Sequence, residues 1–184
     1  ILKQRALTQI KTFPLAHGQR AMWFIHQAAP ESAAYHVTFS ARICTEVDME
    51  AFRQAVQAMV DRHSSLRTTY AILDGELVQQ VHGYMECLIQ VRQAPGAGSG
   101  DLKELVMNAY REPFDLERGP LLRVQLFVCS EKDCVLLLTA HHIACDGWSF
   151  MLLLDELRAL YAANKARIVA ALPRPRVEFV DCVE

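Results

Sequence analysis

The sequence predicts an α/β domain, a two-layer sandwich in which helices pack on a mixed, mostly antiparallel β-sheet. Several segments alternate apolar and polar residues with the period of two that a half-buried strand requires. Other segments repeat apolar residues every three or four positions, as a helix with one buried face does. Two pairs of expected strands are joined by short polar turns, which makes those strands antiparallel neighbours.

The first half of the chain is expected to contain two helices, one strand and a hairpin. These elements are a helix over residues 18–28, a strand over 35–43, a helix over 49–63, and hairpin strands over 66–73 and 76–82. Pro30 ends the first helix, and Asp48 offers a side-chain cap for the second. Asp74 and Gly75 form the dipeptide most typical of a two-residue hairpin turn.

The second half of the chain is expected to add a strand, a helix, a second hairpin and a long helix. These elements are a strand near residues 87–91, a helix over 101–109, hairpin strands over 122–128 and 134–140, and a helix over 150–161. Asp101 is expected to cap the helix that follows it. The continuous apolar run of the last strand predicts burial on both of its faces. A Pro-Arg-Pro break at 173–175 follows the last helix, and the tail 177–184 is too short to be a domain.

The composition is that of an ordinary folded domain, since 52% of the 184 residues are apolar and 22% are charged. The formal net charge is −2 and the basic residues are scattered, so no nucleic acid partner is expected. No membrane segment is expected either, because the apolar runs are far shorter than the roughly 18 residues that cross a bilayer. The first residues lack an initiator Met and a secretory signal, so we expect a piece of a longer chain.

The six cysteines contain no Cys-x-x-Cys pair, so neither a zinc framework nor a disulfide scaffold is expected. Reduced thiols in a cytoplasmic protein are the expected state. Cys145 is a candidate nucleophile, but no neighbouring Lys is present that would lower the pKa of its thiol.

The most informative segment is the string His-His-Ile-Ala-Cys-Asp-Gly-Trp-Ser over residues 141–149, where a buried strand ends and a helix begins. Side chains alternate along a strand, so His141 and His142 point to opposite faces and only one of them can face a cavity. A metal site that uses both is therefore poor geometry, and no metal is expected. An imidazole with Asp146 four residues on suits proton transfer or substrate positioning. The alternative to a functional role is a pair of core histidines that are hydrogen-bonded to the backbone.

The pattern His-His-x-x-x-Asp-Gly-Trp-Ser resembles the active-site motif of the condensation domains of nonribosomal peptide synthetases, which belong to the chloramphenicol-acetyltransferase-like superfamily. Residues 14–25 resemble the first core motif of that family, residues 62–70 its second, and residues 113–123 a further common stretch. Ser64 stands where the family often has Glu. The resemblance runs from Phe13 to about Asp181.

A complete condensation domain is a pseudo-dimer of two such lobes and is about twice this long. The resemblance therefore implies that residues 1–184 are the N-terminal lobe, a chloramphenicol-acetyltransferase-like lobe. Residues 173–184 would begin the connection to an absent C-terminal lobe.

The resemblance also implies which residues support catalysis. His142 would be the catalytic histidine, which orients or deprotonates the acceptor amine or stabilises the charge that develops during its attack. His141 would point into the fold. Asp146 would be structural, held in an ion pair with Arg62, and Gly147 would allow close approach of the substrate. The substrate-binding residues are unknown.

Each of these assignments has a plainer alternative. Arg62 could be a solvated residue favoured by the dipole at a helix C-terminus, and Arg67 is the second choice as partner of Asp146. Gly147 could simply begin a helix, and Ser149 could cap it. Trp148 is expected to be a packing residue.

The implied reaction is amide bond formation between a donor acyl or peptidyl thioester and an acceptor aminoacyl thioester. Each substrate is carried on a phosphopantetheine arm, so no metal or directly bound cofactor is needed. The implied partners are the C-terminal lobe, the donor and acceptor carrier protein domains, and an adenylation domain in the same assembly line; the isolated lobe would be inactive. The alternatives are a free-standing acyl-CoA-dependent acyltransferase and a non-catalytic docking lobe.

Overall fold

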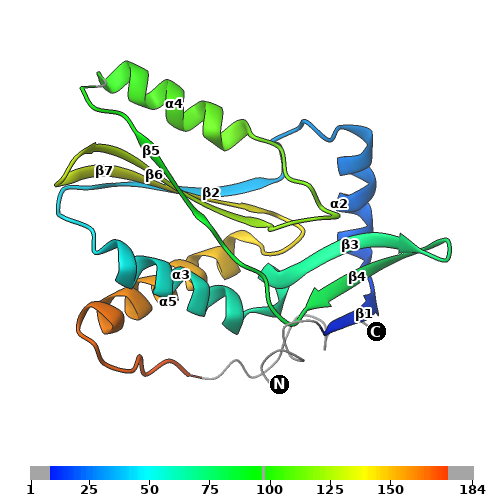
Figure 1. Cartoon of the computed structure of the whole chain (residues 1–184). Helices are drawn as coiled ribbons and strands as arrows, with labels where there is room; N and C mark the ends of the chain where they lie inside the picture. Colours follow the sequence, from blue (N-terminus) through cyan, green and yellow to red (C-terminus); the bar gives the residue numbers. More distant parts are fainter. Residues whose placement is uncertain (1–8, 97, 174–184) are drawn as a thin grey trace.

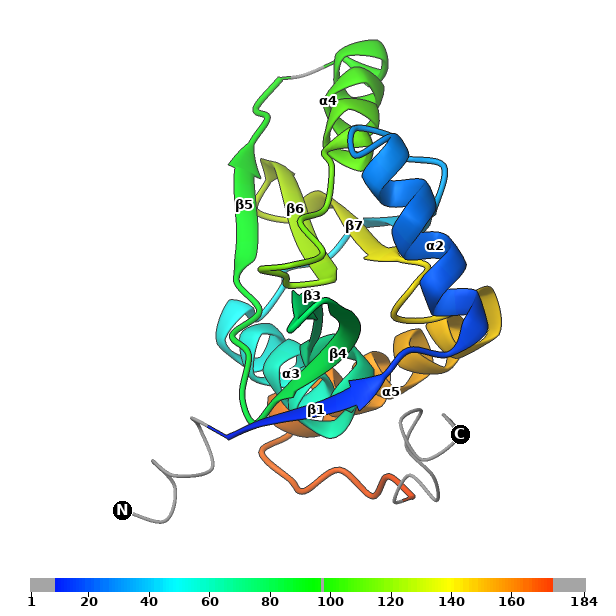
Figure 2. The same ribbon diagram turned by 90° about the vertical axis from the view of Figure 1, so that its right-hand side faces the viewer.

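The computed structural model describes residues 9–96 and 98–173. Of the expected break at 173–175 only Pro173 is among the described residues, and the tail 177–184 lies outside them. Two sheets and the helices around them make up this part of the chain (Figures 1 and 2). The strands are β1 (Ile10–Pro14), β2 (His36–Ile43), β3 (Thr68–Leu73), β4 (Glu76–His82), β5 (Ile89–Gln93), β6 (Leu122–Ser130) and β7 (Asp133–His141). The helices are α2 (His17–Ala28), α3 (Met49–Arg62), α4 (Ser99–Arg111), α5 (Gly147–Lys165) and the short 3-10 turn η1 (Ser64–Arg67).

The larger sheet has the strand order β2-β7-β6-β5. Strands β2, β7 and β6 are antiparallel, whereas β5 runs parallel to β6 because the crossover between them passes through α4. Strand β7 is central and is buried from Cys134 to His141, so the predicted burial on both faces is confirmed.

Helices cover both faces of this sheet, as Figure 1 shows. Leu136 and Leu138 of β7 join the apolar cluster that contains α3 and α5. Val135 and Leu137, which point the other way, pack with Leu102 and other residues of α4. The α/β class and the mostly antiparallel pairing are confirmed, and α4 adds a layer on the second face. The buried apolar side chains of the described residues form three clusters.

The smaller sheet has the order β1-β4-β3 and lies beside α2 (Figure 2). Asp74 and Gly75 turn the chain between β3 and β4, with φ of 51° and 84°, so the predicted hairpin is confirmed. Strand β1 is not among the elements that the sequence predicts. Four of its five side chains are exposed, so the strand leaves no alternating apolar pattern.

The two predicted carboxylate caps have different outcomes. Asp48 Oδ1 accepts a hydrogen bond from the Ala51 N–H at 3.0 Å, which confirms this cap of α3. The cap predicted at Asp101 is wrong, because α4 begins at Ser99 and its N-cap residue is Gly98. Asp101 lies in the first turn and accepts from the Gly98 N–H at 3.3 Å, where a carboxylate also favours the helix dipole.

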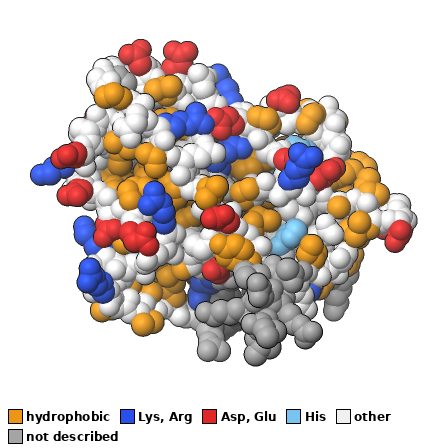
Figure 3. Space-filling model, viewed as in Figure 1, with side chains coloured by type: hydrophobic (Ala, Val, Ile, Leu, Met, Phe, Trp, Pro, Cys, Tyr) orange, Lys and Arg blue, Asp and Glu red, His pale blue; other side chains and the backbone are white. Residues whose placement is uncertain are grey.

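The surface in Figure 3 mixes basic and acidic side chains and shows no basic patch on that face. Within the part of the chain that the structure describes, no helix has the length and apolar character that crossing a membrane requires.

Candidate active site

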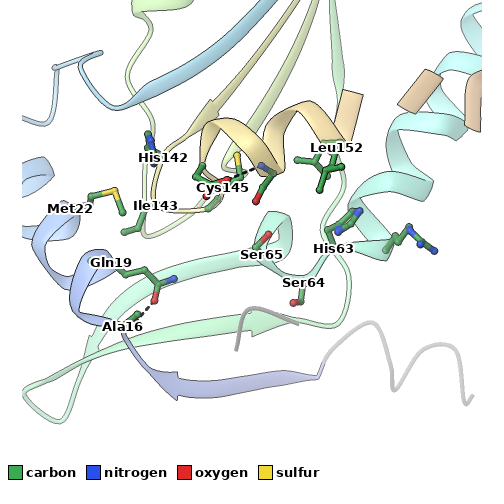
Figure 4. A pocket seen from close by; sticks show the side chains of 16 residues that line it. Ala16, Gln19, Met22, His63, Ser64, Ser65, His142, Ile143, Cys145 and Leu152 are labelled. Atoms are coloured by element: carbon green, nitrogen blue, oxygen red, sulfur yellow. Dashed lines mark hydrogen bonds between the residues drawn. The ribbon is translucent and has the colours of Figure 1, made fainter. Parts of the chain in front are cut away.

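A cavity of about 540 Å³ opens where α2, the end of α3, η1 and the start of α5 meet (Figure 4). The loop over residues 142–146 forms one wall of it. The side chains and backbone that line it come from Ala16, Gly18, Gln19, Met22, Arg62, His63, Ser64, Ser65, His142, Ile143, Ala144, Cys145, Asp146, Ser149, Leu152 and Leu153. The cavity thus brings together residues from three of the four segments that resemble family motifs, those over 14–25, 62–70 and 141–149.

The two adjacent histidines have opposite environments, as their alternation predicts. His142 is exposed and lines the cavity, while its backbone N–H donates to the Tyr35 carbonyl at 2.8 Å. His141 is only 2% exposed and lies inside the fold. The predicted orientation of this pair is therefore confirmed, and only His142 is available to a molecule in the cavity.

His141 lies in a cluster of aromatic and imidazole rings. Its ring centroid is 5.6 Å from that of His26, 6.2 Å from that of His36 and 6.0 Å from that of Phe114. Its Nδ1 accepts the Ile143 N–H at 3.2 Å, which requires this nitrogen to be unprotonated. Burial, followed by the neighbouring imidazoles, lowers the pKa of His141 to about 4, so the ring is neutral near pH 7. No pattern in the sequence points to His26 or His36, because only the tertiary fold brings them to His141.

The predicted ion pair between Arg62 and Asp146 is wrong in this structure. Arg62 Nε donates to Glu156 Oε2 at 3.0 Å, and its Nη2 donates to the Pro173 carbonyl. Glu156 is on α5, which packs along α3, so it is the carboxylate within reach of the α3 C-terminus. The same Glu156 oxygen contacts His63 Nε2 at 2.7 Å, so one carboxylate joins the end of α3 to α5.

Asp146 is instead the N-cap of α5. Its Oδ1 accepts the Ser149 N–H at 2.7 Å, and this bond lowers the pKa of the Asp146 carboxyl. The prediction that Ser149 caps the helix is wrong, because its own backbone N–H is the group that is capped. The alternative pairing of Asp146 with Arg67 is also wrong, since the Arg67 guanidinium donates to the carbonyls of Val60 and His82.

Three further residues of the motif have environments that bear on their chemistry. Burial raises the pKa of the Cys145 thiol to about 12, so this side chain is a neutral thiol and a poor nucleophile. A Cβ at Gly147 would meet no atom within 4 Å, so nothing in the described chain requires glycine there. Trp148 is 76% exposed, so the prediction that it is a packing residue is wrong within this part of the chain. Among the described residues, no three His, Cys, Asp or Glu side chains are grouped to hold a metal ion.

The chain belongs to the condensation domain family, because residues 9–181 match the family described as Condensation domain. It is similar to one of the linear gramicidin synthase proteins of Brevibacillus parabrevis, with 36% identity over 172 residues. The match covers 91% of this chain and 2% of that synthase.

Two solved structures have a similar fold. In the complex of the X-domain and OxyB from teicoplanin biosynthesis, the TM-score is 0.84 at 27% identity, covering 95% of this chain and 38% of that one. The starter condensation domain of rhizomide synthetase RzmA gives a TM-score of 0.80 at 22% identity, covering 89% of this chain and 40% of that one. The chain therefore spans well under half the length of the proteins it matches.

We expect Glu156→Gln to lower the free energy of unfolding by about 1 to 2 kcal/mol, because Arg62 and His63 would lose a shared, four-fifths buried charged partner. Urea unfolding monitored by circular dichroism measures the change. Asp155→Asn, an exposed change on the same helix, is the matched control and should have little effect. Equal unfolding midpoints for the two variants would contradict the role of Glu156.

We expect the chain to lose stability as the pH falls from 6.5 to about 4. The pKa of His141 is 6.5 when unfolded and lower when folded, so the unfolded state binds more protons across this window. The stabilisation is complete above pH 6.5, and its loss should amount to about 2 to 3 kcal/mol. Burial also lowers the pKa of His26 and His36, so these two residues change the stability with pH in the same direction as His141.

Urea unfolding at several pH values measures this effect. His141→Asn, which keeps an acceptor for the Ile143 N–H, should show a shallower dependence of stability on pH. A variant whose pH dependence equals that of the wild type would show that His141 is not the group responsible.

Proposed function

We propose that the chain is the N-terminal lobe of a condensation domain and that His142 serves amide bond formation in the full-length protein. The donor is a carrier-bound acyl or peptidyl thioester, and the acceptor is a carrier-bound aminoacyl thioester. The observation that carries this proposal is the position of His142. It is the exposed member of the histidine pair, on an anchored loop at the edge of a cavity, in a chain of the condensation domain family.

The proposed reaction needs a group that handles one proton. The acceptor nitrogen attacks the thioester carbonyl carbon, the C–N bond forms, and the C–S bond then breaks to release the donor arm as a thiol. One proton leaves the nitrogen and one reaches the sulfur. The His142 imidazole can accept the proton, orient the amine or stabilise the charge of the intermediate, and a histidine serves each role near neutral pH. Both substrates stay on phosphopantetheine arms, so no directly bound cofactor is proposed.

We propose that a C-terminal lobe closes the cavity on its open side. Trp148, Met151 and Leu152 at the start of α5 are 76%, 56% and 52% exposed, and Leu152 lines the cavity. Apolar side chains grouped in this way favour contact with another protein surface. Because both thioesters must be held near His142, the isolated lobe would lack one wall of the site and would be inactive.

We propose the two carrier protein domains and an adenylation domain of the same assembly line as the other partners. The similarity to a linear gramicidin synthase supports this setting. A cytoplasmic location is also proposed, since the cysteines within the described residues are free thiols.

A second candidate is a docking lobe without catalytic activity. It is favoured by the similarity to an X-domain whose structure was determined in a complex with OxyB. The two candidates differ in what they require of His142, because a docking surface does not need a free imidazole at the edge of a cavity.

We expect His142→Ala in the full-length protein to lower amide formation by at least about a hundredfold, the lower range for loss of acid–base catalysis. The measurement is product formation from loaded donor and acceptor carrier proteins. Unfolding should hardly change, because the side chain is exposed. His17→Ala, at an exposed histidine that does not line the cavity, is the matched control. Full activity of His142→Ala would remove His142 from its proposed role, whereas a wild-type protein that makes no amide would favour the docking lobe.

We expect Gly147→Ala to change the free energy of unfolding by less than about 0.5 kcal/mol, since the added methyl group meets open space. Amide formation should nevertheless fall, because the methyl group would narrow the approach of a substrate arm to His142. The two measurements are urea unfolding and the carrier-based assay. Unchanged turnover would mean that Gly147 only begins the helix.

A further inference from the structure

Hydrogen bonds from consecutive backbone N–H groups hold the end of β7 and the start of the loop that carries His142. The N–H groups of residues 141–144 have these partners: His141 to the Leu121 carbonyl at 3.1 Å, His142 to the Tyr35 carbonyl at 2.8 Å, Ile143 to His141 Nδ1 at 3.2 Å, and Ala144 to the His141 carbonyl at 2.9 Å. The carbonyl of Ile143 accepts a hydrogen bond from a side chain, the Tyr70 hydroxyl, at 3.2 Å. Tyr70 is on β3, in the smaller sheet, and thus reaches the loop from another part of the chain.

Tyr70 belongs to a buried polar network. Gln19 Nε2 donates to the Tyr70 oxygen at 3.0 Å, and Gln19 Oε1 accepts the Ala16 N–H at 3.0 Å, as Figure 4 shows for the second bond. Gln19 also lies 3.4 Å from Gln79 Oε1, and Gln79 Nε2 donates to the Pro14 carbonyl at 2.8 Å. The exposed fractions of Gln19, Tyr70 and Gln79 are 3%, 1% and 1%, so water does not compete for these bonds.

This arrangement fixes the direction in which the Tyr70 hydroxyl donates. Its oxygen already accepts from Gln19, so its proton is directed to Ile143. Burial raises the pKa of Tyr70 well above its ordinary value, which keeps the hydroxyl protonated and able to donate. The Tyr70 ring packs separately, in a cluster with Trp23 and Ile143. Packing and hydrogen bonding by Tyr70 can therefore be tested independently.

We propose that Tyr70 is a positioning residue, whose hydrogen bond to the Ile143 carbonyl sets the direction of the preceding side chain, that of His142. Gln19 in turn fixes Tyr70 by donating a hydrogen bond to its oxygen. The proposal rests on the proposed function of His142. Ile143 is 3% exposed, so without the hydroxyl its carbonyl would be left buried or the loop would have to move. Either change would alter the position of His142 relative to a substrate in the cavity.

The first test is the activity of Tyr70→Phe in the full-length protein. This change removes the hydroxyl and keeps the ring, and kcat for amide formation should fall about tenfold while KM changes less than about twofold. Tyr161→Phe is the matched control, because the Tyr161 hydroxyl also bonds a backbone group, the Asp48 N–H at 3.0 Å, at the start of α3 and away from the loop. Its kcat should stay at the wild-type value. An equal kcat for both variants would overturn the proposal.

The second test needs no activity and uses the 184-residue chain, whose described residues form buried apolar clusters of their own. The imidazole signals of His142 and their titration are followed by NMR, with His142→Ala used to assign them. Tyr70→Phe should shift these signals and Tyr161→Phe should not, even where the two variants lose similar stability. Gln19→Met should cause a smaller shift in the same sense, and this variant decides the question if Tyr70→Phe fails to fold.

The two tests separate the positioning role from the proposed function. If the wild-type full-length protein makes no amide, the proposed function fails, and the NMR comparison alone decides whether Tyr70 positions His142. Unchanged His142 signals in Tyr70→Phe would overturn the positioning role whatever the activity.

Discussion

The position of the His142 imidazole depends on the two-sided burial of strand β7. Helices α3 and α5 cover one face of this strand and α4 covers the other, so its residues are buried as far as His141. A strand offers only two directions for its side chains, and both are occupied by core at this point. The chain leaves the sheet directly after His141, and His142 is therefore the first side chain that reaches the cavity.

The burial of His141 gives it a role that its exposed neighbour cannot have. Because its ring is neutral, its Nδ1 can accept the Ile143 N–H and thus hold the turn that follows it. His26 and His36 pack around it, and burial lowers the pKa of both of these imidazoles as well. The same low-dielectric surroundings that favour these contacts penalise any proton added to the cluster.

Two carboxylates of α5 and its N-cap, Asp146 and Glu156, stabilise the elements around the cavity through different contacts. Asp146 begins α5 by capping it, which fixes where the helix starts at the edge of the cavity. Glu156, farther along α5, binds Arg62 and His63 and so holds the end of α3 against it. From the other side, the buried amide of Gln19 and the phenol of Tyr70 connect α2 and β3 to the loop. The segments that resemble family motifs thus meet through hydrogen bonds as well as through apolar packing.

Local patterns in the sequence were enough to predict the class of fold, the two hairpins, the cap at Asp48 and the opposite orientations of His141 and His142. Each of these depends on neighbours in the chain, through side-chain periodicity or turn chemistry. The same patterns did not reveal β1, whose side chains are mostly exposed. The pairing of Arg62 with Glu156 and the contact of Tyr70 with Ile143 became visible only in the folded chain. Such partners depend on how α5 packs along α3 and how the two sheets meet, and no local pattern encodes these distances.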